Sequence, residues 1–135
     1  MDVRLGSAVI FVHELDRSVD FYAGVLGLSL VDRSPTAALL SSPSSQLVLR
    51  AMGGNAPHPL GAVGVQYGVW AAASEEDLQR CEQELRTRGA HRETRSGDGH
   101  AVVEGRDPDD IVIMIGYPGP DKAPLRELPA RVYGW

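Results

Sequence analysis

The same order of predicted secondary-structure elements occurs twice along this chain. In each half, a short apolar segment precedes a helical pattern, and three further strand-like segments follow. The two helical patterns, 15–27 and 78–89, are nearly equal in length. Each copy of an internal repeat forms one supersecondary unit that needs its neighbour to bury its apolar side. We therefore expect an α+β protein built from two βαβββ modules.

The first half begins with an apolar run, 9–12, whose β-branched residues are typical of a buried strand. Leu15, Val19, Tyr22 and Leu26 then recur at the spacing of one helical face. Gly27 is expected to end this helix, since glycine readily adopts a positive φ at a C-terminal cap. Three more strands are predicted, over 28–31, 37–40 and 46–50.

The second half repeats this order after a strand over 65–72. Ser74 and Asp77 fit a helix N-cap with an acid at its third position. The apolar stripe of this helix is Leu78, Cys81 and Leu85, and Gly89 is expected to end it. Three strands are predicted to follow, over 91–94, 100–104 and 111–115. We expect a single domain, 1–135, and its parts are module one (about 3–51), a linker (52–62), module two (about 63–117) and an irregular tail (118–135).

Composition limits the partners of this chain. Its 135 residues carry a formal net charge of −5, which argues against nucleic acid, because such proteins cluster Lys and Arg against phosphate. No segment approaches the ~20 apolar residues of a membrane-spanning helix, and no signal peptide is evident. Cys81 is the only cysteine, so no internal disulfide is possible, and its helical apolar pattern indicates a buried structural thiol. We expect a cytoplasmic protein.

Two segments carry a family likeness. Residues 12–22, VHELDRSVDFY, with 25–28, VLGL, resemble the first-module signature of the vicinal oxygen chelate superfamily. Residues 107–110, DPDD, before a final apolar strand, resemble its second-module signature. This superfamily includes glyoxalase I, fosfomycin-resistance enzymes, extradiol dioxygenases and bleomycin-binding proteins. The resemblance implies curled mixed sheets that form a cup-shaped pocket, which a second subunit often completes.

The resemblance also implies where metal ligands would lie. Counted from the signatures, these positions are Ser7, Tyr67 (with Gln66 beside it), Met114 and a fourth near Val48. Hydroxyl, thioether and aliphatic side chains cannot form this superfamily's divalent metal site, which uses imidazole nitrogen and carboxylate oxygen. We therefore expect neither a metal nor another cofactor.

Alternation along strands predicts which side chains share the cup face with these positions. They are mostly apolar or aromatic, as in many small-molecule sites. The predicted ligand-binding residues are Ser7, Val9, Phe11, Gln46, Val48, Arg50, Tyr67, Val69, Val102 and Met114. Ala71, Val112, Gly116, His100 and Glu104 have the same parity.

Each polar residue also has a simpler interpretation. Arg50 and Glu104 could pair with each other, and His100 could lie at an exposed loop end. His13 is expected to face solvent. Asp107 and Asp109 are expected to form a turn, since Asp accepts hydrogen bonds from the backbone two residues on. Trp70 has the opposite parity and is expected to pack under the second helix, and His58 is expected in the linker.

Three functions stay open at this point. The first is a binding protein that sequesters an apolar or aromatic compound, such as an antibiotic, without a metal. The second is a metal-independent lyase or isomerase in which His100 and Glu104 act as base and acid, with Tyr67 as a hydrogen-bond donor. The third is a metal-dependent glyoxalase or dioxygenase with displaced ligands, His13 and His100. We also expect a homodimer anchored by Tyr133 and Trp135 in the tail.

Overall fold

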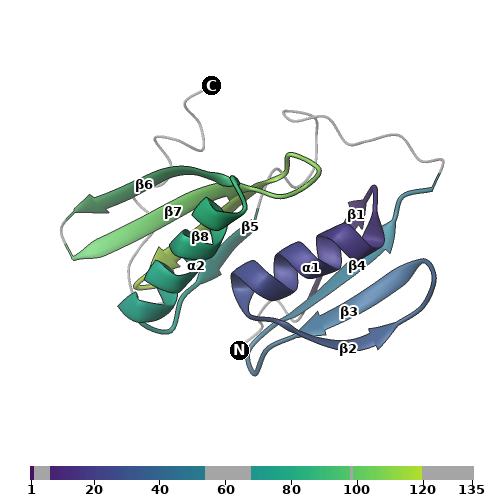
Figure 1. The fold of residues 1–135 in the computed structure, drawn as a ribbon. Coiled ribbons are helices and arrows are strands. Elements are labelled where there is room, and N and C mark those ends of the chain that lie inside the picture. The colour runs from purple at the N-terminus through teal and green to yellow at the C-terminus, as the bar shows by residue number, and fades with distance from the viewer. Residues whose placement is uncertain (2–6, 54–67, 98, 120–135) are drawn as a thin grey trace. The chain divides into compact units, whose positions relative to one another are not determined.

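The computed structural model describes Met1 and residues 7–53, 68–97 and 99–119. Its elements follow the βαβββ order twice (Figure 1). The first set comprises β1 (Ser7–Val12), α1 (Leu15–Leu26), β2 (Ser29–Arg33), β3 (Ala37–Ser41) and β4 (Gln46–Ala51). The second comprises β5 (Gly68–Ala71), α2 (Glu75–Thr87), β6 (His91–Gly97), β7 (His100–Arg106) and β8 (Val112–Tyr117).

The two sets form two four-stranded mixed sheets with the same topology. The strand orders are β1-β4-β3-β2 and β5-β8-β7-β6. In each sheet the first strand pairs in parallel with the last strand of its set, and the other pairs are antiparallel. This confirms the predicted α+β class and the two βαβββ modules.

The chain divides into two compact units that follow these modules with one exchange. The first unit is Met1–Gln66 with Asp107–Ile111, and the second is Tyr67–Arg106 with Val112–Trp135. The turn that joins β7 to β8 therefore groups with the first unit. Both helices of the described residues are too short and too polar to cross a membrane.

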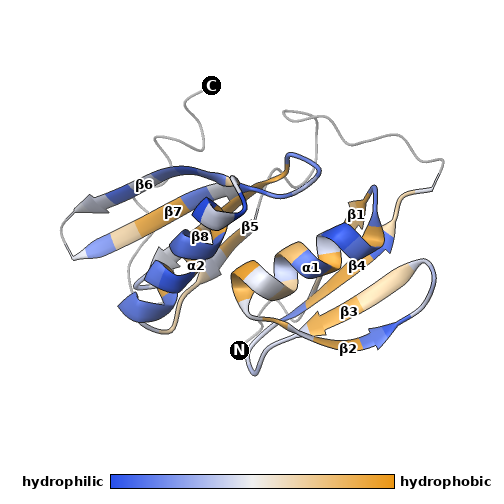
Figure 2. Cartoon of the chain, in the orientation of Figure 1, coloured by the Kyte–Doolittle hydropathy of each residue, from blue (hydrophilic) through white to orange (hydrophobic). Residues whose placement is uncertain are grey.

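In the first unit, α1 packs on one face of the sheet, against β3 and β4. Alternate residues on these strands, namely Ala38, Leu40, Leu47 and Leu49, are almost fully buried. Nearly all of β3 is hydrophobic, whereas α2 and β6 of the second unit are mainly hydrophilic (Figure 2). Because side chains alternate along β3 and β4, these buried residues face α1, and the residues between them point to the other side of the sheet.

The buried face of α1 differs in part from the predicted stripe. Leu15 and Tyr22 are buried as expected, but Phe21 and Val25 are buried while Val19 and Leu26 are only half-buried. The predicted residues recur at intervals of four, three and four, whereas the buried residues are 15, 18, 21, 22 and 25. The buried face is therefore rotated around the helix relative to the predicted stripe. Gly27 ends the helix in the left-handed conformation, as predicted.

In the second unit, α2 has the predicted caps and stripe. Ser74 Oγ accepts a hydrogen bond of 3.1 Å from the Asp77 amide, and Leu78, Cys81 and Leu85 are buried. Gly89 has φ of +67°, and the amides of Gly89 and Ala90 donate to the carbonyls of Arg86 and Leu85. These two hydrogen bonds make a Schellman motif, which satisfies carbonyls that the helix end would otherwise leave unpaired.

The second core also matches expectation at Cys81, and Trp70 lies on the predicted face of the sheet. Burial raises the pKa of the Cys81 thiol, which is the behaviour of a structural cysteine rather than a reactive one. Trp70 pairs in register with the buried Ile115, and its ring lies directly over Gly68. Leu85 of α2 lies against Gly105 on the same face of the sheet, so this is the face that α2 covers.

Some predicted segments have other bounds or lie outside the described residues. β6 and β7 run further than predicted, to Gly97 and Arg106. Positions 65–67 of the predicted fifth strand, most of the linker and nearly all of the tail lie outside the described residues. Gln66, Tyr67, His58, Tyr133 and Trp135 are therefore not placed.

We predict that Gly89→Ala lowers the free energy of unfolding by about 1–2 kcal/mol, because a Cβ is disfavoured at positive φ. A Cβ at Gly89 would meet no other atom, so the effect isolates backbone conformation. Gly97→Ala is the matched control, since it also has open space around it but no positive φ. Urea denaturation measures both variants, and equal stabilities would contradict the role of Gly89.

Candidate functional site

Six of the predicted site residues lie on the face of the first sheet opposite α1, here called the α1-distal face. The parallel register pairs Ser7 with Gln46, Val9 with Val48 and Phe11 with Arg50. β3 extends these rows, and it contributes Ser41, Leu39 and Ala37. None of the predicted site residues is on β3, although the alternation of the predicted strand 37–40 would have indicated Leu39.

Large apolar side chains are exposed on this face. Val9 is 58% exposed and Phe11 is 52% exposed, whereas Val48 and Leu39 are half-buried. The Arg50 guanidinium lies over the Phe11 ring, 5.9 Å from its centroid, in a cation–π arrangement. The α1-distal face is thus an apolar surface with one cation held against an aromatic ring.

The corresponding face of the second sheet, the α2-distal face, is more buried. Val69 pairs with Met114, and Met114 pairs with Glu104 on the next strand. Met114 is 4% exposed and Glu104 is 7% exposed. Val102 has the same parity and is half-buried. The predicted contact of Met114 with a ligand stays a prediction, because such burial also fits a core side chain.

The donor set at the implied metal positions does not fit a divalent metal. Ser7 offers a hydroxyl, Val48 offers no donor and Met114 offers a thioether. Within residues 7–53, 68–97 and 99–119, no group of three or more His, Cys, Asp or Glu could hold a metal ion. Zn²⁺ and similar divalent transition metals need several imidazole or carboxylate ligands in one coordination sphere.

The proposed acid–base pair lies on one strand but its members are far apart. His100 begins β7 opposite Gly97, and Glu104 lies four residues further along the same strand. At about 3.3 Å per residue, this places their Cα atoms ~13 Å apart. They cannot exchange a proton directly, and a reaction would need a substrate that reaches both.

The turn between β7 and β8 is built around the Asp107 carboxylate. Its Oδ1 accepts hydrogen bonds of 2.8 Å from the amides of both Asp109 and Ile111. The Asp110 amide donates to the Asp107 carbonyl at 3.0 Å, and Asp110 has φ of +65°. This confirms that Asp107 forms a turn through the backbone two residues on.

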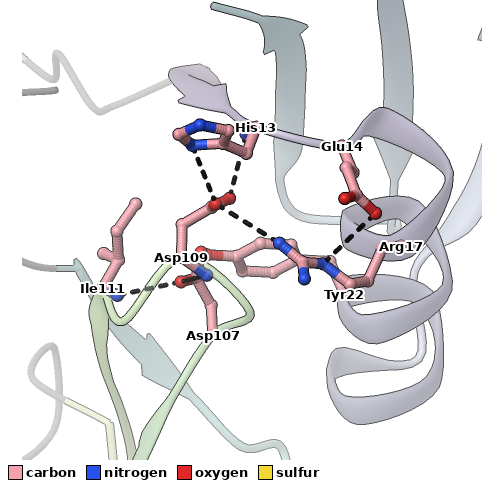
Figure 3. A network of polar contacts seen from close by, with 7 residues as sticks. All are labelled: His13, Glu14, Arg17, Tyr22, Asp107, Asp109 and Ile111. Atoms are coloured by element: carbon pink, nitrogen blue, oxygen red, sulfur yellow. Dashed lines mark hydrogen bonds and ion pairs between the residues drawn. The ribbon is translucent and has the colours of Figure 1, made fainter. Parts of the chain in front are cut away.

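Asp107 also joins this turn to α1 (Figure 3). The Tyr22 hydroxyl donates a hydrogen bond of 2.7 Å to Asp107 Oδ2, and both side chains are buried. Burial, followed by the neighbouring Asp107 charge, raises the pKa of Tyr22 well above its usual range, so the phenol stays a donor. Burial also raises the pKa of Asp107, although hydrogen bonds from Tyr22, Ile111 and Asp109 oppose that rise.

Asp109 makes a second set of contacts with the start of α1 (Figure 3). The His13 amide donates to Asp109 Oδ2 at 3.2 Å, and His13 Nδ1 and Arg17 Nη2 each lie 3.6 Å from Asp109 Oδ1. The His13 side chain is 65% exposed, as predicted for a solvent-facing residue. These contacts are peripheral to the buried hydrogen bond.

The hydrogen bond between Tyr22 and Asp107 was not predicted from the sequence, where Tyr22 fits the apolar stripe of the helix. A buried tyrosine needs a partner for its hydroxyl, and this requirement was the available signal. The predicted pairing of Arg50 with Glu104 stays a prediction, because the contact that the structure shows for Arg50 is with Phe11.

Comparisons with known proteins agree with this architecture. A model of the Glyoxalase/Bleomycin resistance protein/Dioxygenase superfamily matches residues 4–115. A search of curated protein sequences found no match.

Several solved structures share the fold at low sequence identity. A lactoylglutathione lyase from Agrobacterium tumefaciens is 20% identical, with a TM-score of 0.68 over 86% of this chain and 94% of that one. A glyoxylase/bleomycin resistance protein/dioxygenase domain from Frankia sp. EAN1pec is 22% identical, with a TM-score of 0.70 over 86% and 98%. Oxidase ChaP-H2 is 20% identical, with a TM-score of 0.67 over 86% and 94%.

We predict that Tyr22→Phe lowers the free energy of unfolding by about 1–3 kcal/mol, because it removes a donor from a buried carboxylate. Tyr117→Phe is the matched control, since the Tyr117 hydroxyl makes no hydrogen bond within the described part of the chain. Thermal and urea unfolding measure both variants. A Tyr22→Phe protein as stable as the Tyr117→Phe protein would mean that this hydrogen bond contributes nothing.

Proposed function

The chain belongs to the Glyoxalase/Bleomycin resistance protein/Dioxygenase superfamily, and we propose that it is a small-molecule-binding protein that works without a metal. Its ligand would be an apolar or aromatic compound, such as an antibiotic. The observation that carries the proposal is the α1-distal face, where Val9 and Phe11 are both more than half exposed.

The composition of this face supports binding. Val9, Val48 and Leu39 form one continuous cross-strand row, with Phe11 in the next row. Apolar area is costly to leave in water, at roughly 25 cal/mol per Å², and covering it with a ligand recovers that free energy. Aromatic side chains such as Phe11 add stacking geometry worth about 0.5–1.5 kcal/mol. The face therefore favours a flat apolar ligand over a strongly polar one.

The donor chemistry supports the absence of a metal. Ser7, Val48 and Met114 stand at the positions where the family resemblance implies metal ligands, and none of the three offers imidazole nitrogen or carboxylate oxygen. The lactoylglutathione lyase and the oxidase share the fold with this chain, but their identity to it is about 20%, which does not extend their activities to it.

The alternative of an acid–base enzyme has less support. His100 and Glu104 are separated by four residues of one strand, so they are too far apart to form one proton relay. We also propose a cytoplasmic homodimer in which the tail, 118–135, contributes to the dimer interface.

We predict that Phe11→Ala weakens binding of the neutral aromatic probe N-phenyl-1-naphthylamine about tenfold, since it removes the aromatic surface. Tenfold corresponds to about 1.4 kcal/mol. Stability should fall by about 1 kcal/mol or less, because Phe11 is already half exposed. Val31→Ala is the control, since Val31 is 61% exposed but lies at the irregularity in β2. Fluorescence titration measures affinity, and no binding by the unmodified protein would contradict the proposal.

We also predict that EDTA leaves this affinity unchanged. The purified protein should carry less than about one-tenth of an equivalent of Zn, Mn, Ni or Fe by elemental analysis. A stoichiometric metal, or probe binding lost on chelation, would show that displaced ligands hold a metal.

A further inference from the structure

Building on the proposed function, we infer that the ligand is an elongated molecule whose apolar body ends in an anionic group, a carboxylate, sulfonate or phosphate, that binds Arg50. The α1-distal face is graded along its strands. Phe11 and Arg50 form the row at one end, an aliphatic row follows, and Ser7, Gln46 and Ser41 form a polar row at the other end.

The dimensions of these rows limit the size of the ligand. Side chains on one face repeat every two residues, so neighbouring rows are ~7 Å apart along the strands. The strands themselves are ~5 Å apart. A body of two fused rings therefore covers the aliphatic row while its anionic group reaches Arg50. A hydrogen-bonding group at the far end of the ligand would meet Ser7 or Gln46.

Arg50 is suited to an anion because no carboxylate of the described residues neutralises its charge. Among residues 7–53, 68–97 and 99–119, no carboxylate forms an ion pair with Arg50, and its one contact of note is with the Phe11 ring. The acidic residue on this face is Asp32, which pairs with Leu39 on β3, and β3 separates it from β4 and Arg50. Asp32 Oδ1 accepts a hydrogen bond of 2.8 Å from the Arg33 amide.

The second sheet indicates that the fold does not require this aromatic–cation pair. Its topology is the same, so each row of the first sheet has an equivalent in the second. Where the first sheet has Phe11 and Arg50 in register, the second has Ala71 and Gly116. A Cβ at Gly116 would find only ordinary contacts, the nearest at 3.7 Å. The pair is therefore particular to the α1-distal face.

The geometry of Arg50 suits an anion attached to a ring. Arg50 Cζ lies over the Phe11 ring, 5.9 Å from its centroid. A guanidinium offers several N–H donors in a planar fork, which matches carboxylate and sulfonate oxygens. A ligand ring placed beside Phe11 would contact the same guanidinium. The end of the apolar body that carries the anion would thus lie beside Phe11, while the rest of the body covers the aliphatic row.

Two probes with one ring system isolate the charge. N-phenyl-1-naphthylamine is neutral, and 8-anilino-1-naphthalenesulfonate carries the same rings with a sulfonate. We expect the unmodified protein to bind the sulfonate at least tenfold more tightly, and to lose that preference as NaCl is raised to 1 M. Arg50→Gln should reduce the preference to less than threefold. Arg33→Gln is the control, since Arg33 pairs with Asp16 of α1, and it should keep the preference.

The outcomes separate this inference from the proposed function. Equal affinity for both probes, or an unchanged preference in Arg50→Gln, overturns the anionic ligand class while leaving the apolar binding site in place. Failure to bind either probe overturns both. Circular dichroism and urea unfolding of each variant confirm that the native fold is compared throughout.

Discussion

A buried hydrogen bond from Tyr22 to Asp107 connects the two halves of the sequence within one compact unit. The Asp107 carboxylate accepts from α1 through one oxygen and from its own turn through the other. That turn extends to Ile111, directly before β8 begins at Val112. Because burial penalises the charged carboxylate, each of the three donors matters more than it would at the surface.

The fold could be predicted from the sequence because its signals are local. Gly27 and Ser74 end and begin helices through their own backbone or side chain, and both were identified correctly. The alternation of β1 and β4 also predicted which residues share a face. Register was not predictable, because it depends on pairing between distant segments. The contact of Arg50 with Phe11 follows from that register, and so did not follow from either strand alone.

The two sheets have kept one topology but have used their helix-distal faces differently. The first exposes Val9 and Phe11, whereas the second buries Met114 and Glu104. Both sheets carry apolar side chains on this face, and those of the first sheet are the more exposed. The two repeated units can differ in this way because the core of each lies between its own helix and the face of the sheet that the helix covers, not on the helix-distal face.

Both sheets contain a bulge at the same place, just after the helix. Leu30 pairs with Leu40 and Asp32 with Leu39, and in the second sheet His91 pairs with Gly105 and Glu93 with Glu104. One extra residue in each strand therefore inverts the face pattern that follows it. If Val31 and Arg92 were instead paired in a regular ladder, Asp32 and Glu93 would each move to the helix-facing side of their sheet. The irregularity thus keeps these two charged side chains out of the two helix-covered cores.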